Sequence, residues 1–500
     1  MSEHVPSPPD VVEPDRPRSP LLVLFRPLVL IPVSLVLLAI LAPLIYRSTR
    51  FTGIPDLQEI VTKDAVRAHV DDQENAFSFY KSAVTMLPPA ELDLSVGMIA
   101  VTEGRGWEAV PKAVREFLPT ADDVMAEWRL GTECDQGVYV DVASADFTAL
   151  IPITQEMRQF GRLAVLRALK NLDEGDTEEA WKWLRAMMRS SRHTGQHGFL
   201  IERLVGVALH RMAAETMTLW ATHENVTEAN LQRALQELRD IDKLTASNST
   251  SLKAEYISGT NSISKPEVLK GLFNYDRGIP DGLAEAYLFI NGEPQLSRIL
   301  YRHVFANYLS QCDLPRYERA HSGSHLDLYT PAGKESPKVM DTADLEAGVM
   351  RSILARSLIP AVSNCVTAFD QERARQAALE LALQVEVYRR RHGEYPAKLA
   401  DLVPEFIPEV PRDVMGSDPT ERMMLLKRDF DSRAEAEGKP LVEQELPAEG
   451  LIIYSRGRKG SDNNGAIEEG HDVGVRIPIA GSRPATTTKI EEPVIEKEDG

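Results

Sequence analysis

The chain has 500 residues, of which 43% are hydrophobic, so it can bury a sizeable core and form more than one domain. Its 75 acidic and 56 basic residues give a formal charge of -19, which argues against nucleic acid as a partner, because phosphates need a basic face. Cys134, Cys312 and Cys365 are far apart and outside any CxxC spacing, which argues against a disulfide framework or a zinc cluster.

The first predicted element is an uncharged segment, 27–46, that is long enough to cross a bilayer as a helix. Residues 1–26 before it are predicted to form a disordered cytoplasmic tail. The alternative is a cleaved signal peptide, but this tail is long and partly acidic, and IYRSTR after Leu44 lacks a small-x-small cleavage pattern. We therefore predict an uncleaved single-pass transmembrane helix, with membrane lipid as its partner.

Charge bias does not set the orientation of this helix. Three arginines precede it, and Arg47, Arg50 and Lys63 follow it, so the positive-inside rule gives almost a tie. A short N-terminal tail inside and a large domain outside is the usual arrangement for a single N-terminal anchor. We therefore expect the bulk of the chain to be extracytoplasmic.

A helix is the first element predicted after the anchor. The four-residue spacing of Phe79, Ala83 and Leu87 predicts a helix over 75–87, with these three side chains on one face. The segment VYVDVAS, at 138–144, is predicted to be extended.

The clearest helical hairpin lies over 153–217, within an α-helical domain predicted at 47–340. Leucines and alanines mark one face of its first helix, and Gly175 allows a turn before a second apolar stripe. This spacing resembles one tetratricopeptide unit, in which small residues let antiparallel helices approach closely. Any all-α domain can show the same spacing. With the amphipathic segments 200–220 and 231–244, the hairpin predicts a short, degenerate helical array.

The next segments alternate between helix and loop. A helix is predicted over 296–309, and the segment from 321 to 340 is predicted to be a loop. A further helix is expected from Asp344 to Pro360, and a longer one from Ala361 onward. Four side chains at helical spacing support the helix at 296–309: Leu296, Leu300, Val304 and Tyr308.

The end of the long helix carries the most informative sequence, YRRRHGEYP. Gly393 is placed to end the helix, Pro396 forbids its continuation, and Tyr395 can pack back on the helix just left. LADLVPEFIPEVP follows, and the segment 452–472 then runs from a short strand into an Asp/Asn/Gly-rich loop.

This order of parts resembles the C-terminal domain of type II secretion major pseudopilins of the G type, as appended to other bacterial envelope proteins. The resemblance implies a small α+β domain with an antiparallel sheet. Pro411, Asp413 and Gly416 match its Pro-x-Asp-Pro-aromatic-x-Gly turn, but Val414 and Met415 replace the Pro-aromatic pair. An acidic insertion, about 421–449, follows, which leaves the first strand the least secure part.

The resemblance also implies a metal site in the final loop. Pseudopilins of this class bind calcium there, and Asp462, Asn463 and Asp472 match the corresponding acidic or amide positions. Lys459 stands where related loops carry Asp, so its ammonium can replace the metal. The alternative is a glycine-rich hairpin in which Asp and Asn bind their own backbone. No other cofactor is expected.

Histidine pairs supply a second candidate metal site. His193 and His197 are four residues apart, as on a metal-binding helix, and Glu202 follows; HSGSH at 321–325 repeats the spacing. A zinc protease has Glu directly after the first His, where this chain has Thr194.

The sequence thus predicts a mainly α protein with an N-terminal transmembrane helix, a helical-hairpin array, a small α+β pseudopilin-like domain within 341–480 and a disordered tail at 481–500. The expected function is non-catalytic: a single-pass, membrane-anchored bacterial envelope protein that binds or scaffolds an unidentified protein partner. A metal-dependent hydrolase is the alternative. A working secretion pseudopilin is disfavoured, because a long helical region separates the anchor from the module.

Overall fold

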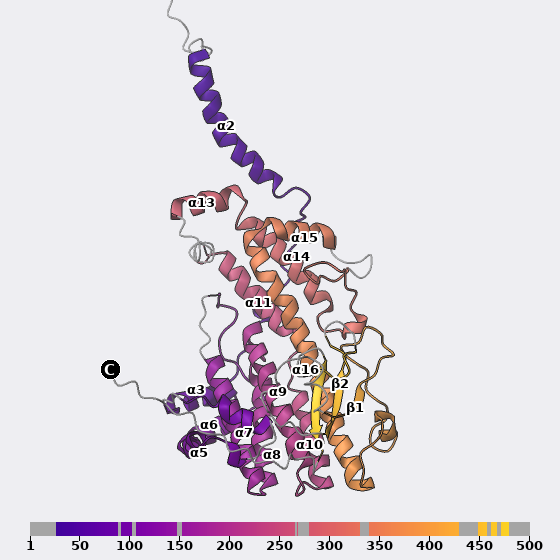
Figure 1. Ribbon diagram of the computed structural model, residues 1–500. Helices are drawn as coiled ribbons and strands as arrows, with labels where there is room; N and C mark the ends of the chain where they lie inside the picture. The colour runs from indigo at the N-terminus through magenta and orange to yellow at the C-terminus, as the bar shows by residue number, and fades with distance from the viewer. Residues whose placement is uncertain are drawn as a thin grey trace, which may run out of the picture.

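Packed helices form the body of the protein, with a small sheet on one side and one projecting helix (Figure 1). The computed structural model describes residues 27–88, 92–102, 107–147, 153–265, 268, 280–330, 340–429, 449–457, 462–467 and 472–479. The prediction of a mainly helical chain with an N-terminal apolar helix and a small C-terminal sheet is confirmed. The tails predicted at 1–26 and 481–500 lie outside the described residues.

The longer helices and the strands are, in chain order, α2 (Pro27–Thr49), α3 (Ala76–Met86), α4 (Ser95–Thr102), α5 (Lys112–Phe117), α6 (Asp122–Thr132), α7 (Ile153–Asp173), α8 (Thr177–His193), α9 (Leu200–Thr222), α10 (Glu228–Asp242), α11 (Asn248–Ile263), α13 (Asp281–Ile290), α14 (Gln295–Gln311), α15 (Thr342–Arg351), α16 (Ile353–His392), β1 (Met424–Asp429), β2 (Glu449–Ser455) and β3 (Val473–Pro478). Short 3-10 helices lie at Lys63–Ala65, Trp107–Ala109, Leu118–Ala121, Arg316–Glu318 and Leu399–Leu402.

Helix α2 projects from the body, as Figure 1 shows. Its segment Ile31–Thr49 is long and apolar enough to cross a membrane. The most apolar part of this segment is not buried against the rest of the protein. The helix continues beyond Tyr46, where the predicted span ended, to Thr49.

Helices α7 and α8 form the predicted hairpin. Gly175 has φ +83° in the turn between them, and Asp176 caps α8 by accepting a hydrogen bond from the Glu179 backbone N–H at 3.0 Å. Helix α9 packs on both helices, and a Cβ on Gly161 of α7 would lie 2.6 Å from Leu209 of α9. Close packing through a small residue is therefore present, as it would be in many all-α proteins.

The helix predicted over 75–87 is present as α3. The buried face of α3 is formed by Phe77, Tyr80 and Ala83, whereas Phe79 is only half-buried. Asn75 caps the first turn of this helix, because its side chain accepts a hydrogen bond from the Phe77 N–H at 3.1 Å. In the segment that was predicted to be extended, residues 138–141 lie outside helices and strands, and residues 142–144 form a turn.

The long helix α16 begins at Ile353, before Pro360, where the sequence predicted a break. Ser352 separates α15 from α16, because its hydroxyl accepts from the Ala355 N–H at 3.2 Å and caps the first turn. Pro360 lies inside α16 and costs a helical hydrogen bond, which burial of Ala355, Val362 and Val366 on either side of it offsets. The boundary predicted between Pro360 and Ala361 is therefore wrong.

The two largest hydrophobic cores among the described residues lie one above the other along the body (Figure 1). The proximal core, near α2, joins α11, α14, α15 and the first half of α16. The distal core joins α3, α6 to α10, the second half of α16 and the sheet. Helices α9 and α16 contribute to both cores and tie them together. The four-residue stripe predicted at 296–309 is buried in the proximal core, as expected.

The antiparallel sheet has the strand order β1-β2-β3, with Leu426 opposite Ile452 and Ile452 opposite Arg476. One face, with Leu451 and Ile453 of β2, packs into the distal core, so the C-terminal module shares its core with the helical body. Strand β1 lies inside the predicted acidic insertion, most of which, 430–448, is outside the described residues.

The turn signal at the end of α16 is confirmed. Gly393 has φ +78° at the helix end, and the Tyr395 hydroxyl donates to Glu386 of α16 at 2.8 Å. The tyrosine therefore packs back on the helix just left. Nearby, buried Asp413 accepts from the backbone N–H groups of Met415 and Arg456 and fastens the following turn to the end of β2.

Candidate functional site

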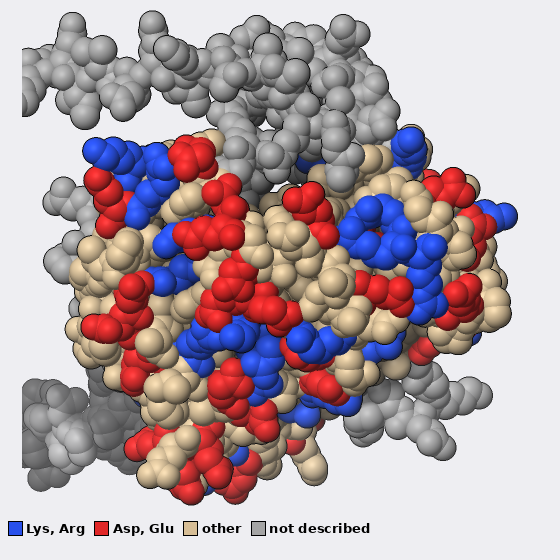
Figure 2. All heavy atoms as spheres, turned by 90° about the horizontal axis from the view of Figure 1, so that it is seen from below, with Lys and Arg blue, Asp and Glu red and all other residues tan. Residues whose placement is uncertain are grey.

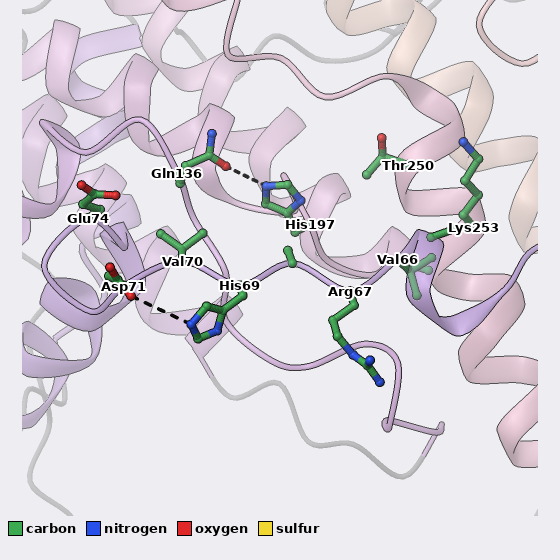
Figure 3. A pocket seen from close by; sticks show the side chains of 13 residues that line it. Val66, Arg67, His69, Val70, Asp71, Glu74, Gln136, His197, Thr250 and Lys253 are labelled. Atoms are coloured by element: carbon green, nitrogen blue, oxygen red, sulfur yellow. Dashed lines mark hydrogen bonds and ion pairs between the residues drawn. The ribbon is translucent and has the colours of Figure 1, made fainter.

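An open pocket of about 620 Å³ lies beside the segment that leads from α2 to α3 (Figure 3). We call it the linker pocket. It is lined by residues of that segment, of two loops and of α11: Ala65, Val66, Arg67, Ala68, His69, Val70, Asp71, Glu74, Gln136, His197, Thr250, Lys253 and Ala254.

Local hydrogen bonds hold the walls of the pocket in place. The Ala76 N–H donates to the Gln136 carbonyl at 2.9 Å, which joins the start of α3 to the second wall. Gly195 has φ +83°, and a Cβ there would lie 2.4 Å or less from the Arg203 backbone, so only glycine fits this turn. The turn ends α8 and brings His197 to the pocket, where its Nε2 lies 2.9 Å from the Gln136 side-chain oxygen.

The charges of the pocket are divided between its ends. Figure 3 shows Asp71 and Glu74 at one end and Arg67 and Lys253 at the other, with the histidines between them. Such a division suits a ligand that carries a cation and a carboxylate some distance apart.

The histidines of the linker pocket have few close partners among the side chains that line it. Its lining contains no serine or cysteine among the described residues. His69 and Asp71 are 3.9 Å apart, both exposed, which is too far for a hydrogen bond. Burial lowers the pKa of His197, and its ring is paired with an amide instead of a carboxylate.

The histidine and glutamate of the predicted metal site have separate partners. His193 ends α8 in the core, its Nδ1 lies 2.8 Å from the Tyr80 hydroxyl, and burial lowers its pKa to about 4. Glu202 accepts from the Phe199 N–H at 2.9 Å and caps α9, and burial raises its pKa to about 7. Only His197 lines the pocket. Because the chain turns at Gly195, the four-residue spacing does not lie on one helix.

Metal ligands are not gathered elsewhere in the part of the chain that the structure describes, where no group of three or more His, Cys, Asp or Glu could hold an ion. In the HSGSH loop, His321 packs edge-on against Tyr329, with ring centroids 5.3 Å apart, and the His325 backbone N–H donates to Glu346.

The calcium residues predicted in the final loop also have protein partners. Buried Asp472 accepts from the backbone N–H groups of Gly457, Gly465 and Ala466 at 2.9 to 3.2 Å, and from Asn463. Asp462 accepts from the Asn464 N–H at 2.8 Å. These contacts favour the alternative in which the acidic side chains bind their own loop; the calcium site stays a prediction. Lys459 lies outside the described residues.

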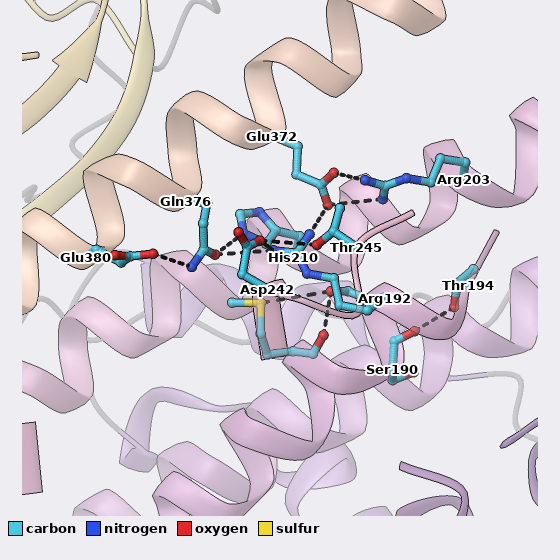
Figure 4. A network of polar contacts seen from close by, with 12 residues as sticks. Ser190, Arg192, Thr194, Arg203, His210, Asp242, Thr245, Glu372, Gln376 and Glu380 are labelled. Atoms are coloured by element: carbon cyan, nitrogen blue, oxygen red, sulfur yellow. Dashed lines mark hydrogen bonds and ion pairs between the residues drawn. The ribbon is translucent and has the colours of Figure 1, made fainter. Parts of the chain in front are cut away.

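A buried ionic network lies between the two cores (Figure 4). Glu372 of α16 accepts from Arg192 of α8 at 2.6 Å and from Arg203 of α9 at 3.1 Å. All three side chains are at most 5% exposed. Arg192 also donates to Asp242 of α10 at 3.0 Å, and Gln376 binds His210 at 3.0 Å.

Burial and the neighbouring charges determine the protonation states of Glu372 and His210 in this network. Burial alone would raise the pKa of Glu372, but the two arginines outweigh it and lower the pKa to about 2. Burial lowers the pKa of His210 to about 3, so the imidazole is neutral. Sequence analysis missed this network, because its members are far apart in the chain and no local pattern marks them. Its enclosure indicates a structural role.

The end of the body farthest from α2 carries mixed charge. Figure 2 shows Lys and Arg interspersed with Asp and Glu over this end. Ion pairs such as Arg391 with Glu228 and Arg233 with Glu178 link neighbouring helices. This surface is typical of a face that meets water.

No family model, no curated protein and no solved structure matches this chain. The pseudopilin and tetratricopeptide resemblances therefore remain expectations drawn from the sequence, and function has to be argued from the geometry of this molecule.

Proposed function

We propose that this protein is a single-pass, membrane-anchored, non-catalytic binding protein of the bacterial envelope. In this proposal α2 crosses the membrane, the body lies outside the cytoplasm, and the linker pocket holds a segment of a protein partner. The apolar, unburied surface of Ile31–Thr49 supports the anchor, because lipid is the environment that removes such a surface from water.

The division of charge in the linker pocket carries the binding proposal. A partner segment with a carboxylate near Lys253, and a cation near Asp71 and Glu74, would satisfy both ends, whereas Arg67 is already paired with Asp64 at 2.9 Å. An extended peptide meets this requirement, since its side chains supply both charges at varied separations. The open shape of the pocket allows the two ends of such a peptide to leave it.

The resemblance to pseudopilins supports the envelope assignment. The order of parts expected from it, a long helix, a short turn of helix and a small antiparallel sheet, agrees with α16, Leu399–Leu402 and β1 to β3. We propose a structural or docking role for this module. The metal-dependent hydrolase is the weaker candidate, because His193 and Glu202 have other partners.

Photo-crosslinking from inside the pocket tests the binding proposal. The full chain, in membranes, carries a photoreactive amino acid in place of Val70, which lines the pocket, or of Gln232, which is exposed on α10. We expect a discrete protein adduct from position 70 and none from position 232. Lys253→Glu should weaken the adduct about tenfold or more, because a like charge then faces the partner's carboxylate.

Two results would contradict the proposal. One is equal crosslinking from the two positions, which would mark collisions without a site. The other is metal-dependent hydrolysis by the full chain that is lost in His197→Ala, which would favour the enzyme.

A further inference from the structure

Helix α13 exposes large apolar side chains at the end of the body next to α2. Leu283 is 65% exposed, Phe289 is 51% exposed and Tyr287 is also exposed, whereas Ala284 and Leu288 face the body and are buried. The helix is therefore apolar on both its inner and outer sides. On a helix that faces water, the side chains at these outer positions are ordinarily polar.

The end of α13 is fastened to the end of α2. The Arg47 guanidinium lies over the Phe289 ring, 4.5 Å from its centroid, and donates to the Phe289 carbonyl. Arg50 donates to the Asn291 carbonyl at 3.4 Å. A Cβ on Gly292, which has φ +79°, would lie 3.0 Å from the Phe51 ring, so the ring covers this turn.

These contacts fix the level of α13 relative to the membrane. Arg47 ends the apolar run of α2, and a guanidinium at such a position lies among lipid headgroups. Figure 1 shows α13 lying across the end of α2 instead of continuing along it. If α2 crosses the bilayer, α13 lies along its surface at headgroup level.

The side chains of α13 suit this level. Tyrosine and phenylalanine are favoured at the boundary between headgroups and acyl chains, and leucine adds apolar area. The sequence of α13 contains Asp281 and Glu285 but no Lys or Arg, so anionic lipid offers it no attraction. The outer face of α13 therefore suits the boundary between headgroups and acyl chains of a bilayer, and neutral lipids are sufficient to bind it.

We propose that α13 is an interfacial membrane helix that lies in the same bilayer surface from which α2 emerges. Leu283, Tyr287 and Phe289 enter the boundary region, and the two helices together hold the body in one orientation on the membrane. This inference rests on the proposed anchoring by α2.

Lipid quenching tests the inference. The full chain, with Cys134→Ser to remove its half-buried thiol, carries a single fluorophore on a cysteine at position 283, 37 or 130, in phosphatidylcholine vesicles. Leu37 monitors α2. Leu130 of α6 is the matched control, since it is 57% exposed but belongs to the helical array of the distal core. Brominated lipids with bromine near the headgroup or deep in the acyl chain serve as quenchers.

We expect shallow bromine to quench the probe at 283, deep bromine to quench the probe at 37, and neither to quench the probe at 130. If 37 is quenched and 283 behaves like 130, the inference about α13 is wrong while the anchor stands. Absence of quenching at 37 would overturn the anchor itself. A probe at 283 that is shielded from both lipid and aqueous quenchers would show that protein covers α13, and would contradict the inference.

Discussion

The two ends of the body differ in what their surfaces can contact. The proximal end carries α2 and α13, whose outer faces expose Leu, Ile, Tyr and Phe side chains. At the distal end charged side chains of both signs are interspersed (Figure 2), and the residues of the distal core lie buried beneath the surface. The two ends of the molecule therefore differ in chemistry: the surface of one end is suited to lipid and that of the other to water.

Helices α9 and α16 make the two ends one body. Each contributes to both cores, and the Glu372 network lies where the cores meet. An orientation set by the membrane at the proximal end would therefore be transmitted to the distal end. The following predictions test how far the two halves depend on each other.

The largest effect is expected at the junction. Glu372→Ala leaves Arg192 and Arg203 buried without their shared carboxylate, which should lower the free energy of unfolding by about 3 to 5 kcal/mol. Arg233→Ala removes an exposed pair with Glu178 and should cost less than about 1 kcal/mol. Chemical unfolding of the full chain in detergent measures both.

Separate unfolding transitions in Glu372→Ala would show that the network couples the cores. A variant as stable as the parent would contradict the role given to this cluster.

A second prediction concerns pH and the start of α9. Burial raises the pKa of Glu202 from 4.5 to about 7, and that of Glu255, beside the same helix start, also to about 7. The folded protein then keeps protons that the unfolded chain releases between pH 4.5 and 7, so stability falls as pH rises through this window. For Glu202 alone the loss is on the order of 2 to 3 kcal/mol.

Unfolding measured from pH 5 to pH 8 checks this sign. Glu202→Gln keeps an oxygen for the Phe199 N–H and should flatten the profile. A parent protein whose stability rises across the same window would contradict the assignment. Glu372 acts in the opposite sense at lower pH, because its contribution is lost as pH falls from 4.5 through about 2.

The distal loop gives a third prediction. Asp472→Asn places an amide where several N–H donors converge and should cost about 1 to 3 kcal/mol. If the carboxylate serves the loop backbone, the parent protein melts at the same temperature in calcium and in chelator. A calcium-dependent rise in melting temperature that Asp472→Asn abolishes would instead support the calcium site.

The smallest effect is expected at the end of α16. Gly393 has φ +78°, so Gly393→Ala should cost about 1 to 2 kcal/mol through backbone strain. Gly282 of α13 is the matched control, since no atom lies within 4 Å of a Cβ built there and its φ is not positive. Gly282→Ala should not destabilise the protein, which thermal unfolding of both variants can establish.

Local signals in the sequence predicted local structure well. The stripe from Leu296 to Tyr308 and the stop at Gly393 depend on neighbours in the chain, and both predictions are confirmed. The spacing within 75–87 predicted helix α3, but it did not mark Phe77 and Tyr80, which are buried in the core. Pro360 was misread as a break, because packing of α16 outweighs a missing hydrogen bond.

The sequence predicted the candidate site less well than it predicted the helices. The linker pocket joins the segment after α2 to His197 and Lys253, which come together only in the folded chain. The Glu372 network likewise depends on contacts between residues remote in sequence. His197 was recognised as a candidate, but as a metal ligand beside His193, because the turn at Gly195 was not anticipated.

Alkaline extraction of membranes tests the central claim, that α2 anchors the proximal end in lipid. The full chain is compared with a variant in which Leu37 and Leu41, two exposed residues within the span, are both changed to Lys. Each lysine near the centre of a span costs about 2.5 to 3.5 kcal/mol. We predict that carbonate leaves the parent chain in the membrane pellet and releases the Leu37→Lys, Leu41→Lys variant with its body still folded. Release of the parent chain, or equal retention of both proteins, would contradict the account.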